Sequence, residues 1–176
     1  MKNPPSAIAR RVSQILSERQ LTIGIAESCS GGLISHQFTN VPGSSNYFIG
    51  GVVAYSNEVK MKILGVNPEV IQRFGAVSRE TARAMALGIA RLLKTDVGLG
   101  VTGIAGPSGG TKEKPVGLVY IALSFKGKVT IRKFNFTGER IEIKNQTAAE
   151  AFRLIEGVIQ GDMVTTQVNK LKLEGF

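Results

Sequence analysis

A serine beside a glycine-rich turn is the first residue in the chain with the setting of a nucleophile. Residues 26–32 read AESCSGG, and Ser28 follows a short apolar run that leads into a helical pattern. A helix N-terminus presents unpaired N–H groups and a partial positive charge, which together can hold an oxyanion or an anionic ligand. Gly31 and Gly32 would let a substrate approach the backbone closely. Ser28 is therefore a candidate nucleophile, with the N–H groups of Ser30, Gly31 and Gly32 as candidate donors to substrate.

Two other interpretations of this segment stay open. Ser28 or Ser30 acting only as a helix cap explains the same pattern. Cys29 is a rival nucleophile, but the one histidine of the chain, His36, is seven residues away and no other imidazole is available to activate a thiol.

A lysine follows the next apolar run. Ser56 or Asn57 is expected to cap a short helix with Lys60 in its first turn. The helix dipole and partial burial would both lower the pKa of a lysine there, and a neutral lysine can act as a general base. Tyr55 is positioned to hydrogen-bond the nucleophile or the substrate. The alternative is that Lys60 is an ordinary surface lysine, as we assume for Lys62.

A third segment is a candidate for binding phosphate or sugar. Residues 103–115 read GIAGPSGGTKEKP, which matches neither of the common glycine-rich phosphate-binding motifs. Thr102 and Gly103, where a buried strand ends, are expected to face a ligand. Arg140 opens the last helix and is a candidate bidentate partner for a phosphate or carboxylate. A flexible loop and a surface arginine are the respective alternatives.

The elements that carry these segments alternate between apolar runs and amphipathic stretches. This order predicts an α/β protein, a three-layer α/β/α sandwich with a mostly parallel mixed sheet and an antiparallel hairpin at one side. Because ligands of open α/β sheets bind beyond the carboxyl ends of the strands, the three segments are expected to meet on one rim. Helices are predicted at residues 6–19, 28–40, 57–64, 68–74, from 78 onward and at 139–159, and strands at 21–26, 49–55, 97–101, 116–125 and 128–136.

Composition narrows the class of protein. The chain has 176 residues, 43% of them hydrophobic, which suits one globular domain. It shows no apolar run long enough for a membrane span and no secretory signal pattern, and a single cysteine suits a reducing cytoplasm. One cysteine and one histidine give no metal-ligand cluster, so we expect no metal or cofactor. The net charge of +9 is scattered, which suits an anionic small ligand and also weak nucleic-acid binding. Three tyrosines, no tryptophan and no aromatic-basic stacking motif argue against nucleic acid as a partner.

Taken together, the motifs resemble the CinA family, and within it the C-terminal domain. The resemblance runs in order over about residues 6–160, and Ser30 stands where the family usually has threonine. The motifs that carry it are AESCSGG (26–32), GSSNYF (43–48), VVAYSNEVK (52–60), LGV (64–66), GAVS (75–78), VTGIAGPSGG (101–110), EKPVGLVYIA (113–122) and GER (138–140).

The resemblance implies an amidohydrolase of nicotinamide mononucleotide that releases nicotinate mononucleotide and ammonia. It also implies a Ser/Lys dyad, which the motifs place on Ser28 and Lys60, with Tyr55, Thr102 and Arg140 as the other family site residues. A non-catalytic nucleotide- or partner-binding module is the alternative, because some family members have little such activity. We expect one domain at residues 1–160 and a C-terminal tail at 161–176, which is either mobile or an arm on a partner subunit of a homo-oligomer.

Overall fold

A five-stranded mixed sheet forms the centre of the computed structural model, which describes the backbone of residues 6–173 and the side chains of residues 6–162. The strands lie in the order β2-β1-β3-β4-β5; β1 pairs in parallel with β2 and β3, and β4 is antiparallel to both of its neighbours. Four of the five strands therefore point the same way. The strands are β1 (Ile23–Glu27), β2 (Phe48–Val53), β3 (Val97–Gly103), β4 (Leu118–Phe125) and β5 (Lys128–Asn135).

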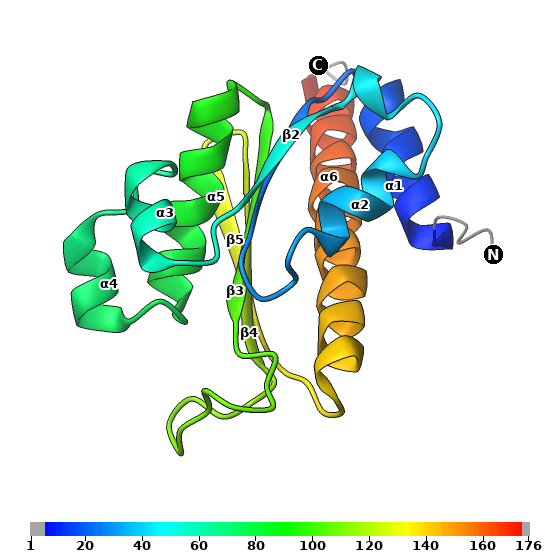
Figure 1. Cartoon of the computed structure of the whole chain (residues 1–176). Coiled ribbons are helices and arrows are strands. Elements are labelled where there is room, and N and C mark those ends of the chain that lie inside the picture. The colour runs from blue at the N-terminus through cyan, green and yellow to red at the C-terminus, as the bar shows by residue number, and fades with distance from the viewer. Residues whose placement is uncertain (1–5, 174–176) are drawn as a thin grey trace.

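Helices cover both faces of the sheet and complete the predicted three-layer α/β/α sandwich (Figure 1). One face carries α1 (Ala7–Glu18), α2 (Leu33–Thr39) and α6 (Arg140–Leu173). The other face carries α3 (Asn57–Lys62), α4 (Pro68–Phe74) and α5 (Arg79–Leu93). A 3-10 turn, η1 (Ser44–Asn46), leads into β2.

Close packing of α5 on β3 depends on two glycines in the strand. A Cβ atom at Gly98 would lie 2.2 Å from the carbonyl oxygen of Ala86, and one at Gly100 would lie 2.4 Å from that of Ala82. Only glycine permits this approach of helix backbone to strand. On the opposite face the aromatic rings of Phe38 and Phe152 pack with their centroids 4.7 Å apart. The two layers bury the central strands β1, β3 and β4, while the edge strands β2 and β5 stay partly exposed, so the polar groups at the ends of β1 and β3 are held on a buried base.

Helix α2 begins at Leu33, which corrects the predicted start at Ser28. Gly31 and Gly32 take φ angles of 63° and 91°, in the left-handed region, and these interrupt the helix. Residues 28–32 therefore form a turn between β1 and α2. Ser28 lies at the strand end rather than in the first turn of a helix.

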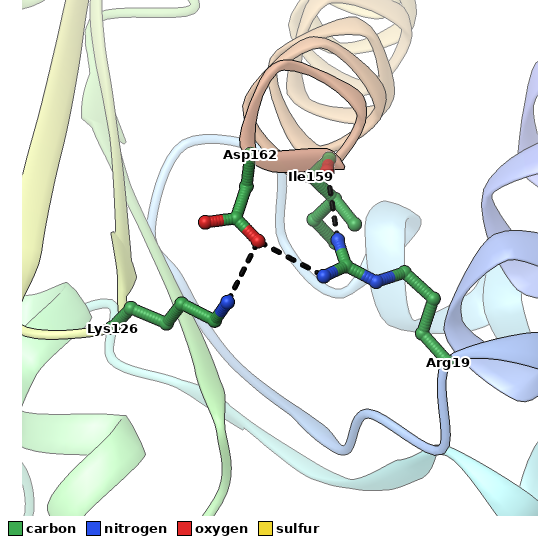
Figure 2. A network of polar contacts seen from close by, with 4 residues as sticks. All are labelled: Arg19, Lys126, Ile159 and Asp162. Atoms are coloured by element: carbon green, nitrogen blue, oxygen red, sulfur yellow. Dashed lines mark hydrogen bonds and ion pairs between the residues drawn. The ribbon is translucent and has the colours of Figure 1, made fainter. Parts of the chain in front are cut away.

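Helix α6 continues to Leu173, which corrects the predicted end at residue 159. Neither Gly157 nor Gly161 breaks it. Asp162 ties this part of α6 to the rest of the fold: its Oδ2 accepts from Arg19 Nη2 at 2.9 Å and from Lys126 Nζ at 2.8 Å (Figure 2). A C-terminal tail or subunit arm is expected at residues 161–176. Most side chains of this segment lie outside the described residues, so its role stays a prediction.

Candidate active site

The end of β1 holds Ser28 between two neighbouring strands. The Ser28 N–H donates to the Val101 carbonyl at 3.0 Å, and the carbonyl of Glu27 accepts from the Ala54 N–H at 2.7 Å. The backbone at Ser28 and at the preceding Glu27 is thus hydrogen-bonded to β3 on one side and to the residue after β2 on the other. These bonds fix the backbone that carries the candidate nucleophile.

Lys60 reaches Ser28 from α3. The side chain is 1% exposed, and its Nζ lies 3.1 Å from Ser28 Oγ, 2.7 Å from the Ala54 carbonyl oxygen and 3.1 Å from that of Tyr55. Burial lowers the pKa of Lys60. The predicted lowering of this pKa by the helix dipole does not hold, because α3 has only six residues and Lys60 lies in its last turn, where the dipole favours a cation. Desolvation is the effect that disfavours the charged form.

No carboxylate pairs with Lys60 among the side chains that the structure describes. Lys62, by contrast, is exposed and pairs with Glu58 at 2.7 Å. A neutral amine has two hydrogens and one lone pair. The two backbone carbonyls beside Lys60 can accept both hydrogens, which leaves the lone pair for the proton of the Ser28 hydroxyl. The geometry therefore suits a serine and a neutral lysine as acid–base partners.

The pair opens into a pocket of about 240 Å³ at the carboxyl ends of the parallel strands. Tyr55, Thr102, Gly103 and Arg140 line it together with Ser28 and Lys60, as the expected convergence on one rim required. Thr102 is buried, and its hydroxyl donates to the Ala76 carbonyl at 2.7 Å. The remaining lining residues are Cys29, Asn57, Ala76, Val77, Ile104, Ala105, Gly106, Ser108 and Gly109.

Arg140 closes the pocket from the start of α6. Its Nη1 donates to the Gly106 carbonyl at 2.7 Å, and its Nη2 donates to the Tyr55 hydroxyl at 3.2 Å. Tyr55 is 63% exposed, so this bridge lies at the mouth. Arg140 thus connects two walls of the pocket and leaves its other N–H groups available to a ligand.

Ser30, Gly31 and Gly32 do not line the pocket, contrary to the substrate contact expected of them. The Gly31 N–H donates to the Ser28 carbonyl at 3.2 Å, and the Gly32 N–H donates to Glu27 Oε2 at 3.0 Å. Two of the three expected oxyanion donors are therefore already used inside the protein. Ser30 is fully buried, and its Oγ has no hydrogen-bond partner among the described residues.

Two features of this turn were not predicted. Glu27 is buried, and its carboxylate accepts from backbone N–H groups at the start of α2. A carboxylate shortly before a helix was a readable signal, because helix N-termini favour anions. In addition, burial raises the pKa of the Cys29 thiol to about 12, which makes it a poor nucleophile near neutrality.

The residues that the structure describes contain no group of three or more histidine, cysteine, aspartate or glutamate side chains arranged to hold a metal ion. None of the helices, as far as they are described, has both the length and the apolar character needed to cross a membrane.

The fold and this rim define an α/β protein with a buried serine–lysine pair at the carboxyl ends of parallel strands. The family model described as the CinA C-terminal domain matches residues 5–159. The chain belongs to this family.

Named relatives and solved structures agree with the family. A putative competence-damage inducible protein of Moorella thermoacetica is 55% identical over 141 residues, which cover 80% of this chain and 34% of the relative. A CinA-like protein of Kosmotoga olearia is 51% identical over 144 residues, covering 82% and 35%. The chain thus spans about a third of the length of these relatives. The structure of a competence/damage inducible protein from Agrobacterium tumefaciens is 38% identical and superposes with a TM-score of 0.86, covering 89% of this chain and 98% of that one.

Proposed function

We propose that the protein hydrolyses the carboxamide of nicotinamide mononucleotide to nicotinate mononucleotide and ammonia. The observation that carries the proposal is the position of Lys60: its Nζ is buried, has no carboxylate partner in the described structure and lies 3.1 Å from Ser28 Oγ. A lysine in this state can take a proton from serine near neutral pH. The resemblance of the motifs to the CinA family supplies the substrate.

In the first half of the reaction Ser28 becomes acylated. Neutral Lys60 takes the proton of the Ser28 hydroxyl while Oγ attacks the amide carbon. The N–H of Cys29, the residue after the nucleophile, is the backbone donor that we assign to the oxyanion. The Lys60 ammonium then gives its proton to the amide nitrogen, the C–N bond breaks, and ammonia leaves.

In the second half water cleaves the ester on Ser28. Lys60, neutral again, takes a proton from water as the oxygen attacks the acyl carbon. The bond to Oγ breaks, and Lys60 returns the proton to Ser28. The products are nicotinate mononucleotide and the starting enzyme, so one lysine serves both halves as base and then as acid.

The shape and charge of the pocket fit this substrate. A pocket of about 240 Å³ suits the nicotinamide ring, with the ribose and phosphate extending toward the mouth. Arg140 at the mouth and the backbone of residues 103–109 are then the groups nearest the phosphate.

The test is ammonia release from nicotinamide mononucleotide by the purified protein, with chromatographic identification of nicotinate mononucleotide. Ser28→Ala serves as the blank. Ammonia release that requires Ser28 supports the proposal. Binding of the mononucleotide with no turnover would contradict it and favour the non-catalytic binding module instead.

A further inference from the structure

Glu27 is a buried carboxylate that the proposed reaction does not use. Its side chain is 0% exposed, and it directly precedes Ser28 in the chain. Its two oxygens accept four hydrogen bonds of 2.7–3.1 Å, from the N–H groups of Gly32, Ile34 and Ser35 and from the Ser35 hydroxyl. Each oxygen receives two donors, so the carboxylate is held in one orientation.

These contacts replace a cap that α2 lacks. Gly32 is the N-cap residue, and it has no side chain with which to accept from the first turn. Glu27 supplies that acceptor from five residues upstream and also places negative charge at the positive end of the helix. The carboxylate therefore fixes the far end of the turn formed by residues 28–32.

The near end of the same turn is fixed by backbone contacts. Ser28 donates to Val101, and Gly31 donates back to the Ser28 carbonyl at 3.2 Å. Ser28, at the near end, and Cys29, the residue after it, both line the pocket. Because the turn has only five residues, we expect a change at its far end to displace Ser28 Oγ, the group that faces Lys60.

We infer that Glu27 is the positioning residue of the nucleophile: it clamps turn 28–32 to the start of α2 and so keeps Ser28 Oγ within reach of Lys60 Nζ. The same contacts turn the carboxylate toward α2, so that a negative charge one residue from Ser28 does not pair with the lysine. The catalytic part of this inference rests on the proposed function, whereas the clamp itself does not.

The variant that tests the clamp is Glu27→Gln. Glutamine keeps the size of the side chain but presents an NH₂ group where one oxygen accepted, so donors face donors. We expect amide hydrogen exchange at Gly32, Ile34 and Ser35 to accelerate at least about tenfold. Glu58→Gln, at an exposed carboxylate on α3, is the matched control and should leave exchange in this turn unchanged.

Cys29 gives a second readout, because it is the only cysteine in the chain and lies buried in the turn. Its alkylation by iodoacetamide should accelerate in Glu27→Gln. Loss of the Glu27 charge also favours the Cys29 thiolate and would raise the alkylation rate without any opening of the turn. The alkylation rate is therefore compared with hydrogen exchange, which reports opening of the turn independently of the thiol.

Activity separates positioning from general instability. With nicotinamide mononucleotide as substrate, Glu27→Gln should lower kcat about 100-fold, leave KM within about threefold and leave the acidic limb of the pH profile in place, because Lys60 is unaltered. Ser35→Ala, which removes one of four donors, should lower kcat less than tenfold. A wild-type protein that does not turn over this substrate would remove the proposed function, and the exchange data would still decide the clamp.

The inference is overturned if Glu27→Gln folds and leaves both hydrogen exchange and kcat unchanged. If that variant does not fold, exchange in the wild-type protein decides. Amide protons of Gly32 and Ile34 that exchange as fast as those of an open loop would overturn the clamp, and slow exchange together with the reduced kcat of Ser35→Ala would support it.

Discussion

Lys60 Nζ and Ser28 Oγ lie 3.1 Å apart, although the two residues are 32 positions apart in the chain and sit on different elements. The lysine extends from α3 to the carbonyls of Ala54 and Tyr55, which follow β2, and the serine directly follows β1. Because β1 and β2 are parallel neighbours, the segments that follow them leave the sheet at the same edge. The contact is thus a consequence of the sheet topology, and it makes both residues testable by substitution.

The first prediction concerns which side chain in the turn is the nucleophile. Ser28→Ala should lower kcat/KM for nicotinamide mononucleotide by at least about 10³-fold, because no covalent intermediate can form. Cys29→Ala should retain most of the activity, since its thiol is buried with a pKa raised to about 12. Steady-state ammonia release measures both. The reverse pattern would move the nucleophile to Cys29.

The second prediction concerns the mouth of the pocket. Arg140→Ala should raise KM for nicotinamide mononucleotide roughly 10- to 100-fold, since charge-assisted hydrogen bonds to phosphate contribute about 1.5–3 kcal/mol. Nicotinamide riboside, which lacks the phosphate, should be affected much less. Tyr55→Phe is the control for the loss of the Arg140–Tyr55 contact alone. Equal losses on both substrates would show that Arg140 supports the pocket walls without contacting phosphate.

The sequence predicts that the site residues meet at one edge of the sheet, but it does not predict which of their side chains are buried. The order of elements alone predicts that Ser28, Tyr55, Lys60 and Thr102 share one rim, because each lies at or after the carboxyl end of a strand and these ends lie at the same edge of the sheet. The depth to which Lys60 is buried is a tertiary property, and no local pattern in NEVKMK distinguishes it from its neighbour Lys62.

Two predictions differ from the structure for local reasons: the role of the glycine pair after Ser28 and the length of α6. As a sequence pattern, Gly31 and Gly32 predict room for a substrate, but in the structure their left-handed φ angles end the turn and delay the start of α2. Their N–H groups serve Ser28 and Glu27 rather than a ligand. The stretch after residue 159 lacks a clear apolar stripe, so the sequence gives no positive signal that α6 continues. It also contains no proline to stop a helix, which is consistent with the observed continuation.

The third prediction concerns the buried hydroxyl of Ser30. Because its Oγ has no partner among the described residues, Ser30→Ala removes an unsatisfied polar group and should leave the free energy of unfolding unchanged or raise it. Ser13→Ala is the matched contrast: it leaves the buried Tyr47 hydroxyl unpaired and should cost about 1–3 kcal/mol. Thermal unfolding measures both. A destabilised Ser30→Ala variant, or one with a raised KM, would restore a binding role for this residue.

The fourth prediction concerns the contact between α6 and the body of the protein. Hydrogen bonds from Lys126 and Arg19 lower the pKa of Asp162, so its contribution to stability is present above the unfolded value of about 3.9 and is lost as pH falls through the lower folded value. Asp162→Asn should therefore lower Tm by a few degrees at pH 7, and the difference should shrink as pH falls below about 3.9 and vanish once pH has passed the lower folded value. Glu58→Gln, at an exposed ion pair, should not change Tm. A constant difference at every pH would mean that charge is not the cause.

The last prediction concerns the charge of Lys60. A base must be neutral, and burial lowers the lysine pKa from its ordinary value of about 10.4. The rate should therefore fall as pH is lowered through a midpoint below the ordinary lysine value of about 10.4, and rise to a plateau above that midpoint. Lys60→Arg keeps N–H donors for the carbonyls of Ala54 and Tyr55 but stays charged at any accessible pH, so it should fold and be almost inactive across the profile. Lys62→Arg, at the exposed neighbour, should keep both the rate and the profile. A fully active Lys60→Arg enzyme, or an acidic limb that is unchanged in it, would show that another group is the base and would separate the serine–lysine contact from catalysis.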